Sequence, residues 1–182
     1  MLTKIKCQIL FFIILFASNI VHAQDFNQAK TRIIDGVGEA ITGDTLKIDG
    51  LNIQLEFIIA PKIEQECLDK EIGRYKCGIV SKNILEDQLK NNIISCFLKE
   101  WSDDGKIIGQ CRNKDNEDIS ELMLFSGWSI VKWFDRNKLK EPVECSFDNC
   151  KNIPEDYWYI EKDAVKNKRG LWSSKFDLPW RE

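Results

Sequence analysis

Four carboxylates surround the part of the sequence in which hydrolytic chemistry is most plausible. Asp44 lies in a short polar stretch, and Glu56, Glu64 and Glu66 lie within and after an alternating apolar run at residues 53–59. Carboxylate oxygens bind hard cations such as Ca²⁺ and also act as general acids or bases. The four residues therefore indicate either a cation site or, because charges that flank a strand end are usually solvated, no site at all.

The histidine content excludes several kinds of catalysis. His22 is the only histidine of the chain, and it lies in an N-terminal segment with the pattern of a secretory signal. Removal of that segment would leave no imidazole, which excludes Ser–His and Cys–His nucleophiles and histidine metal ligands. Carboxylate, lysine, tyrosine and arginine side chains remain for acid and base chemistry.

Residues 1–23 have the three parts of a signal peptide. Lys4 and Lys6 form a positive start, residues 9–16 form an apolar core, and residues 21–23 resemble a cleavage site. The apolar core is too short to favour a membrane span, although an uncleaved anchor is the alternative. We therefore expect an exported protein, periplasmic or secreted, with no membrane span after cleavage.

The mature chain is expected to be mildly acidic and long enough for one domain. The whole sequence has 26 basic and 29 acidic side chains; the signal holds two lysines and no acid, so 24 basic against 29 acidic leave a net charge of −5. This charge disfavours nucleic acid as a partner. A basic run at residues 162–169, near Trp172, Trp180 and Arg181, could contact phosphates and bases, or could be the solvated face of a helix.

An even number of cysteines follows the signal, which in an exported chain predicts disulfides. We expect three local bridges, and Cys96 and Cys111 lie on opposite arms of a predicted hairpin, near enough to pair. A zinc site is the alternative, but the sequence has no CxxC pair. The six cysteines are Cys67, Cys77, Cys96, Cys111, Cys145 and Cys150.

The first half of the chain predicts a small antiparallel sheet. Residues 38–61 read as three short strands, with Asp49-Gly50 as a strong hairpin signal between two of them. Alternation in the third strand puts four apolar side chains on one face: Ile53, Leu55, Phe57 and Ile59.

The second half predicts helices around a further hairpin. A helix at 118–127 has Asp118 and Glu121 in the arrangement of a capping box and Gly127 as its stop. The other expected elements are a helix at 78–91, a hairpin with arms at 93–101 and 106–111, a polar excursion at 135–152 pinned by a disulfide, and a helix at 154–170. This order favours an α+β fold with a five-stranded Greek-key barrel and about three helices, as in an OB-fold.

A series of short stretches resembles the thermonuclease family, the staphylococcal-nuclease-like domains, over residues 38–181 after a lead-in at 24–37. The matching stretches are residues 40–46, residues 53–67, Cys77-Gly78, Cys96 with Gly105-Lys106 and Cys111, residues 126–128, and a closing pattern from Tyr157 to Arg181. The resemblance implies a five-stranded OB barrel with helices. It also implies two bridges, Cys67–Cys77 and Cys96–Cys111.

The same resemblance implies where the chemistry of the family would lie. In the family two aspartates and a backbone carbonyl hold calcium, a glutamate handles the attacking water, and two arginines clamp the phosphate. In this chain the metal positions are Asp44 and Ile59, the glutamate position is Lys62, and the arginine positions are Gln54 and Lys106. Ile59 offers no oxygen, Lys62 reverses the charge, and Gln54 has no charged fork.

These substitutions lead to the functional prediction. We expect an exported nuclease-like domain whose catalytic groups are degenerate and which acts as a binding or structural module. It would need no cofactor, and its partner would be an unidentified component of the envelope or the extracellular space. The alternative is a Ca²⁺-dependent phosphodiesterase for DNA or RNA, built from Asp44 and a rearranged acidic shell. Asp44 could equally serve only the backbone of its turn.

Overall fold

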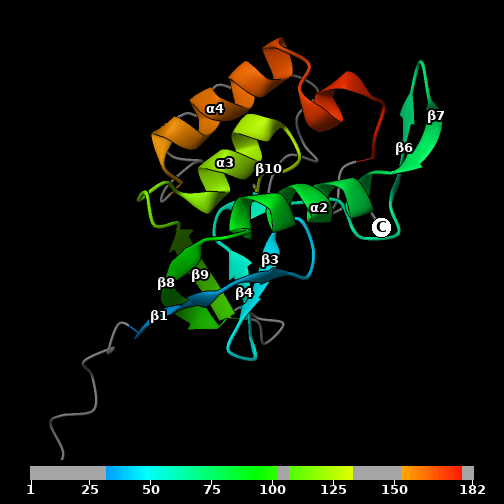
Figure 1. The fold of residues 1–182 in the computed structure, drawn as a ribbon. Helices are drawn as coiled ribbons and strands as arrows, with labels where there is room; N and C mark the ends of the chain where they lie inside the picture. The colour runs from blue at the N-terminus through cyan, green and yellow to red at the C-terminus, as the bar shows by residue number, and fades with distance from the viewer. Residues whose placement is uncertain (1–31, 102–106, 133–152, 178–182) are drawn as a thin grey trace, which may run out of the picture. The chain divides into compact units, whose positions relative to one another are not determined.

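The computed structural model describes residues 32–101, 107–132 and 153–177. Figure 1 shows them as an α+β fold in which three α-helices lie against a curved sheet. The helices are α2 (Cys77–Leu89), α3 (Ile119–Ser126) and α4 (Glu155–Lys166), with a 3-10 helix η2 (Gly170–Ser173) after α4. The main sheet contains β1 (Arg32–Val37), β2 (Glu39–Ala40), β3 (Thr45–Ile48), β4 (Leu51–Leu55), β8 (Ile93–Trp101) and β9 (Ile107–Arg112). Two small sheets pair β5 (Ile58–Ile59) with β10 (Ile130–Val131) and β6 (Glu66–Asp69) with β7 (Gly73–Lys76).

The main sheet nearly closes into a barrel. Its strand order is β1-β8-β9-β4-β3-β2, and β4 and β9 are its parallel pair. The two outermost strands, β1 and β2, are consecutive parts of one chain run separated only by Gly38. The expected α+β class is therefore confirmed as a mixed, barrel-like sheet of six strands with three helices. The strand count exceeds the predicted five because the first run pairs with β8 before Gly38 and with β3 after it.

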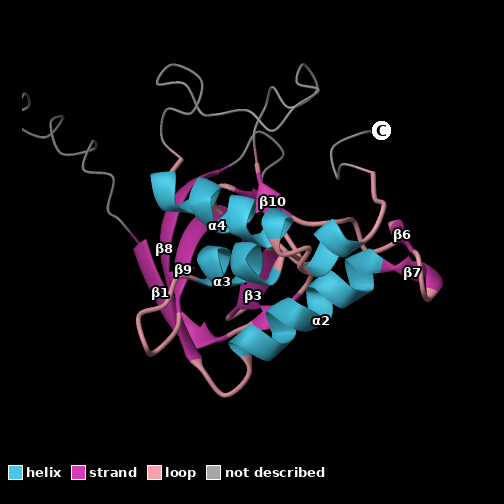
Figure 2. Ribbon diagram, turned by 90° about the horizontal axis from the view of Figure 1, so that it is seen from above, coloured by secondary structure: helices cyan, strands magenta, loops and turns pink. Residues whose placement is uncertain are grey.

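The three helices gather on one side of this sheet, as Figures 1 and 2 both show. Apolar side chains from strands and helices meet between them in one cluster with little or no exposed surface. Burial of such side chains is the main favourable term in folding. The largest fully buried members are Leu46, Ile48, Ile53, Leu55, Ile58, Leu85, Leu89, Ile94, Ile119, Met123, Leu124 and Tyr157.

The predicted strand at residues 53–59 is wrong after Leu55. β4 ends there, β5 begins at Ile58, and Phe57 between them has a φ of 63°. A residue in the left-handed region breaks the period of an extended strand. Ile58 is consequently fully buried, whereas Ile59 is only partly buried on the side of a second apolar cluster.

The predicted helix at residues 118–127 is confirmed. Asp118 caps α3 through its carboxylate, and Gly127 ends it with a φ of 75°. The predicted helix at 154–170 ends earlier, at Lys166, because Lys168 and Gly170 also adopt positive φ values. A Cβ on Gly127 would lie 2.3 Å from the carbonyl oxygen of Arg169, so the ends of α3 and α4 meet where no side chain fits.

Several elements were missed from the sequence, including β10 and η2. β1 lies in the stretch taken as a lead-in, and the β6–β7 hairpin lies where no strand was expected. In this hairpin the Asp69 carboxylate accepts hydrogen bonds from the N–H groups of Glu71 at 2.8 Å and Ile72 at 3.1 Å. Gly73 follows with a φ of 79°. Aspartate before a glycine turn was therefore the available signal.

Two disulfides join the described residues. Cys67 pairs with Cys77 across the β6–β7 hairpin, and Cys96 pairs with Cys111 across β8 and β9, as the resemblance implied. Disulfides persist in oxidising compartments, so these bonds indicate an extracytoplasmic location. Cys145 and Cys150 lie outside the described residues, as do the signal segment and the excursion at 135–152. Within the described ranges, no helix has the length and apolarity to cross a membrane.

We expect the Cys96–Cys111 bond to contribute substantially to stability. The bond spans 15 residues and lies inside the core. Replacing both cysteines with alanine should lower the free energy of unfolding by about 3 kcal/mol, because the unfolded chain regains loop freedom. Urea unfolding of wild type and double variant, both oxidised and fully reduced, measures this. Equal unfolding midpoints for the two oxidised proteins would contradict it.

Candidate functional site

Asp44 lies where the resemblance places a metal ligand, but its carboxylate is occupied by protein donors. One oxygen accepts hydrogen bonds from the hydroxyls of Thr42 at 2.6 Å and Thr45 at 3.1 Å. The other accepts the backbone N–H of Ala60 at 3.0 Å, and the side chain is only 8% exposed. Asp44 therefore joins the β2–β3 turn to the end of β5.

Close packing fixes the turn that carries Asp44. A Cβ on Gly43 would lie 1.8 Å from the hydroxyl of Ser81 on α2 and 2.8 Å from the Cβ of Ala60. The Ser81 hydroxyl itself donates to the carbonyl of Trp128 at 2.7 Å. The turn thus has no space for a side chain before Asp44, which explains the glycine.

Three of the other predicted positions, Gln54, Ile59 and Lys62, are described by the structure, and they form no polar centre with Asp44. Gln54 is buried on β4, opposite Thr45 of β3 and Ile108 of β9. Ile59 pairs with Ile130 in the small β5–β10 sheet and packs on the second apolar cluster, which contains Cys67, Cys77 and Leu171. Lys62 is exposed on the following loop, and Lys106 lies outside the described residues.

The glutamates that might have rebuilt an acidic shell face basic side chains instead. Glu56 forms an ion pair with Lys99 at 2.5 Å. Glu64 pairs with Lys76 at 3.0 Å, and Glu66 lies 3.6 Å from Arg74. The hydrogen bond with Glu64 raises the pKa of Lys76.

These side chains do not fit a calcium ion. Ca²⁺ takes six to eight oxygen ligands, usually including several carboxylates. The Asp44 oxygens already accept three hydrogen bonds, and Ile59 contributes only hydrocarbon at the second ligand position. Among the described residues, no three Asp, Glu, His or Cys side chains are grouped to hold a metal.

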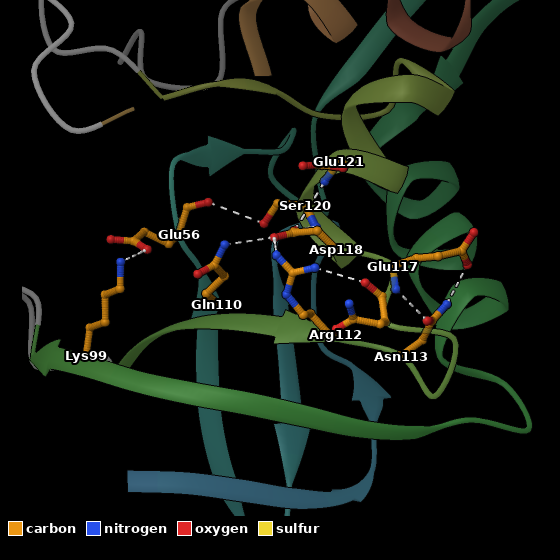
Figure 3. Close-up of polar contacts among 10 residues, drawn as sticks. Glu56, Lys99, Gln110, Arg112, Asn113, Glu117, Asp118, Ser120 and Glu121 are labelled. Carbon is orange, nitrogen blue, oxygen red and sulfur yellow. Dashed lines mark hydrogen bonds and ion pairs between the residues drawn. The ribbon is translucent and has the colours of Figure 1, made fainter. Parts of the chain in front are cut away.

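A denser polar network surrounds Asp118, which sequence reasoning treated only as a helix cap (Figure 3). Its carboxylate accepts the N–H groups of Ser120 at 2.8 Å and Glu121 at 3.4 Å. It also accepts the side-chain amide of Gln110 at 3.0 Å and lies 3.8 Å from the guanidinium of Arg112. Asp118 is 2% exposed, so a buried charge here holds two side chains of β9.

The loop from β9 to α3 is built around Asn113. Its side-chain oxygen accepts the N–H groups of Asp115 at 3.0 Å and Glu117 at 2.9 Å, and its amide donates to the Glu117 carboxylate at 2.7 Å. Arg112 donates to the carbonyl of Asn116 at 2.9 Å. The loop is therefore ordered by its own side chains, and it fixes the guanidinium from a second side.

Burial and charge alter the acidity of two groups beside Asp118. Burial, followed by the charge of Asp118, raises the pKa of Tyr157 well above its usual range. The pKa of Glu121 is raised by burial and by the charges of Asp118 and Asp156, against the opposing effect of Arg112. Both pKa values rise chiefly because burial disfavours the ionised form of the group itself, and next because the negative charge of Asp118 lies nearby.

A groove of about 410 Å³ lies next to this network, on strands other than those that carry Asp44 and Ile59. The groove is lined by residues of three strands and one loop, among them Ile33 of β1, Phe97 of β8, Gln110 and Arg112 of β9, and Lys114 of the loop that follows β9. The sequence contained a signal for the groove, because every second residue of each strand faces outward and these outward residues are partly apolar and partly polar. The strand pairing that aligns those positions was not predicted.

The remaining tryptophans and basic residues form no second site in the described ranges. Trp128 stacks edge-on with Tyr75, and Trp172 stacks edge-on with Phe176, so both are packing residues. Within the basic run, Arg169 pairs with Asp163 at 2.5 Å and lies over the ring of Phe125. The other members of the run, Lys162, Lys166 and Lys168, are exposed on or after α4.

The structure describes a barrel-like α+β domain with disulfides that indicate an extracytoplasmic location, and comparison with known proteins adds one relative. The chain is a distant homologue of the succinoglycan biosynthesis protein ExoI of Rhizobium meliloti (strain 1021), with 30% identity over 143 residues. The alignment covers 78% of this chain and 66% of that protein, slightly less than two thirds of its length. No description of a known protein family matches the chain, so the thermonuclease resemblance stays a prediction.

Glu121 should make the stability of the protein depend on pH. A carboxyl group whose pKa is raised above the ordinary 4.5 opposes folding once it is ionised, so its penalty grows as the pH rises through that range. We expect Glu121→Gln to raise the melting temperature at neutral pH. The difference should shrink as the pH falls and vanish well below 4.5, where the carboxyl group is protonated in both states.

Thermal unfolding of both proteins across this pH range tests the expectation. Glu117→Gln on the preceding loop is a matched control, since its carboxylate is exposed and accepts the Asn113 amide. A melting temperature that falls at neutral pH in Glu121→Gln would contradict the assigned direction.

Proposed function

We propose that this protein is an exported binding module that handles a glycan outside the cytoplasm and has no thermonuclease-type activity. The observation that carries the proposal is its homology to a protein of succinoglycan biosynthesis. That relative is named for the assembly of a polysaccharide. The same class of ligand is therefore the first candidate for this chain.

The barrel supports a binding role. With β1 and β2 taken as one bent strand, the sheet order becomes that of a closed five-stranded barrel, as in an OB-fold. OB barrels bind oligosaccharides and oligonucleotides on the face of their second and third strands and on the adjoining loops. The net charge of −5 expected for the mature chain weighs against the oligonucleotide, because nucleic-acid affinity depends on phosphate neutralisation.

The former catalytic positions support the loss of hydrolysis. Phosphodiester cleavage needs a cation or cationic donors where negative charge develops. Asp44 instead holds three protein donors, and Ile59 places an apolar side chain at the second ligand position. The region serves the packing of the turn against β5 and α2.

The disulfides support an external site of action. Both described bonds need oxidising conditions to form and persist. A periplasmic or secreted domain of this kind could meet a polysaccharide during its assembly or after its release. No enzymatic step and no cofactor is part of the proposal.

Binding to polysaccharide tests the proposal directly. The mature protein should be retarded in native gels that contain succinoglycan, and retarded less in gels that contain neutral dextran. Protein unfolded by reduction of its disulfides controls for non-specific adhesion. Equal mobility in all gels, or equal retardation by both polysaccharides, would overturn the proposal.

A calcium and nuclease assay tests the absence of the family chemistry. Millimolar Ca²⁺ should leave the melting temperature unchanged, and single-stranded DNA and RNA should remain intact. Asp44→Ala should lower the free energy of unfolding by about 2–4 kcal/mol with or without Ca²⁺, because it leaves the buried Ala60 N–H without its acceptor.

The enzyme alternative predicts the opposite pattern. Under it, Ca²⁺ would stabilise the wild-type protein, and both that stabilisation and nucleic-acid cleavage would disappear in Asp44→Ala. Lys47→Ala, an exposed substitution on the neighbouring strand, is a control that should change neither stability nor cleavage.

A further inference from the structure

We propose that the groove on the outer face of β1, β8 and β9 binds an acidic segment of a saccharide. This inference rests on the proposed function, because it gives a place and a charge to the glycan ligand. The groove has about 410 Å³ of space, enough for a small part of a chain rather than a whole polymer. We call it the β1–β8–β9 groove.

Strand register builds the groove from side chains far apart in the sequence. Phe97 of β8 lies opposite Ile33 of β1 on one side and Gln110 of β9 on the other. In the adjacent row, Ser95 of β8 lies opposite Asp35 of β1 on one side and Arg112 of β9 on the other. Outward side chains of three neighbouring strands thus form an apolar strip that continues into a polar one.

The apolar strip is more exposed than folding alone explains. Phe97 is 43% exposed in the middle of β8, and Ile33, near the start of the outermost strand β1, is 63% exposed. An aromatic ring with an open face can stack on the C–H face of a sugar ring, which removes apolar surface of both partners from water. The strip therefore offers a flat platform beside hydrogen-bonding groups.

The polar side of the groove is held in place before any ligand arrives. The buried Asp118 fixes the amide of Gln110 at 3.0 Å and lies 3.8 Å from the guanidinium of Arg112, which also donates to the Asn116 carbonyl. These contacts use one donor of the amide and only some of the five N–H donors of the guanidinium. Preorganised groups lose less entropy on binding than mobile ones.

The charge of the lining selects an anion. Arg112 and Lys114 of the lining are basic and none of its described members is acidic; the exposed Asp35 of β1, opposite Ser95, lies outside the lining. An arginine already fixed in orientation suits a carboxylate, which it can bind through two parallel hydrogen bonds. A carboxylated or similarly acidic sugar next to a neutral ring matches this combination of platform and cations.

A nucleic acid fits the groove less well. Binding along a phosphate backbone needs a track of cations with several stacking rings. The lining has two cations and one aromatic ring within an acidic chain. Single-stranded DNA is therefore a competitor in the test rather than the proposed ligand.

The experiment measures, by calorimetry, how tightly the oxidised mature protein binds two probes of equal length. The probes are hexagalacturonate and its uncharged methyl ester. Hexagalacturonate should bind, and the uncharged ester should bind at least about tenfold more weakly, since it cannot pair with Arg112 or Lys114. Added salt should weaken the first interaction and not the second.

Four variants locate the site. Phe97→Ala and Lys114→Glu should each weaken hexagalacturonate binding by about tenfold, through lost stacking and reversed charge. Tyr159→Ala on α4 and Lys47→Ala on β3 are the matched controls, because both side chains are exposed away from the groove, and they should bind as wild type does. Unchanged melting temperatures exclude unfolding as the cause.

The outcomes separate the groove from the proposed function. Succinoglycan could retard the protein while Phe97→Ala and Lys114→Glu leave its affinity for hexagalacturonate unchanged. That result would overturn the binding site in the groove and leave the proposed function standing. If the protein bound neither hexagalacturonate nor succinoglycan, both the groove proposal and the proposed function would be overturned. Tighter binding of an oligo-dT of equal charge, weakened by the same two variants, would replace the saccharide with nucleic acid.

Discussion

A single buried carboxylate holds together the parts of this protein that come from the second half of the chain. Asp118 starts α3, takes the amide of Gln110 and the charge of Arg112 on β9, and lies beside the hydroxyl of Tyr157 on α4. A charge removed from water is tolerated only when hydrogen bonds and an opposite charge replace its hydration. The start of α3, the last strand of the main sheet (β9) and α4 are therefore joined through the contacts of one side chain.

The same requirement explains why the β1–β8–β9 groove is polar on one side. Asp118 holds the side chains of Gln110 and Arg112, and both residues also line the groove. Under the proposed function, the same two side chains would serve both the buried charge and the ligand. Asp44 differs from Asp118 in this respect. It lies where the thermonuclease resemblance places a metal ligand, but its carboxylate accepts hydrogen bonds from the protein itself.

Local signals in the sequence were reliable where one residue decides the backbone. The Asp118 cap and the Gly127 stop define α3 as expected, because both act through short-range hydrogen bonds and glycine conformation. The strand alternation failed at Phe57, which has a positive φ value that phenylalanine rarely adopts and packs edge-on against Tyr157 of a distant helix, so no local preference signalled it. The groove could not be found either, since it depends on register between strands that are distant in the chain.

Closure of the sheet through the Gly38 bend has a consequence for the order of folding. β2 pairs with β3, which follows it closely in the sequence. β1 pairs with β8, which comes much later in the chain, so β1 can pair only after β8 is available. Until then β1 is an unpaired edge, open to other chains. β8 also carries Cys96, so the strand that closes the barrel brings one half of the core disulfide with it. A chain halted before β9 therefore lacks both its closing hairpin and the covalent bond that would keep it closed.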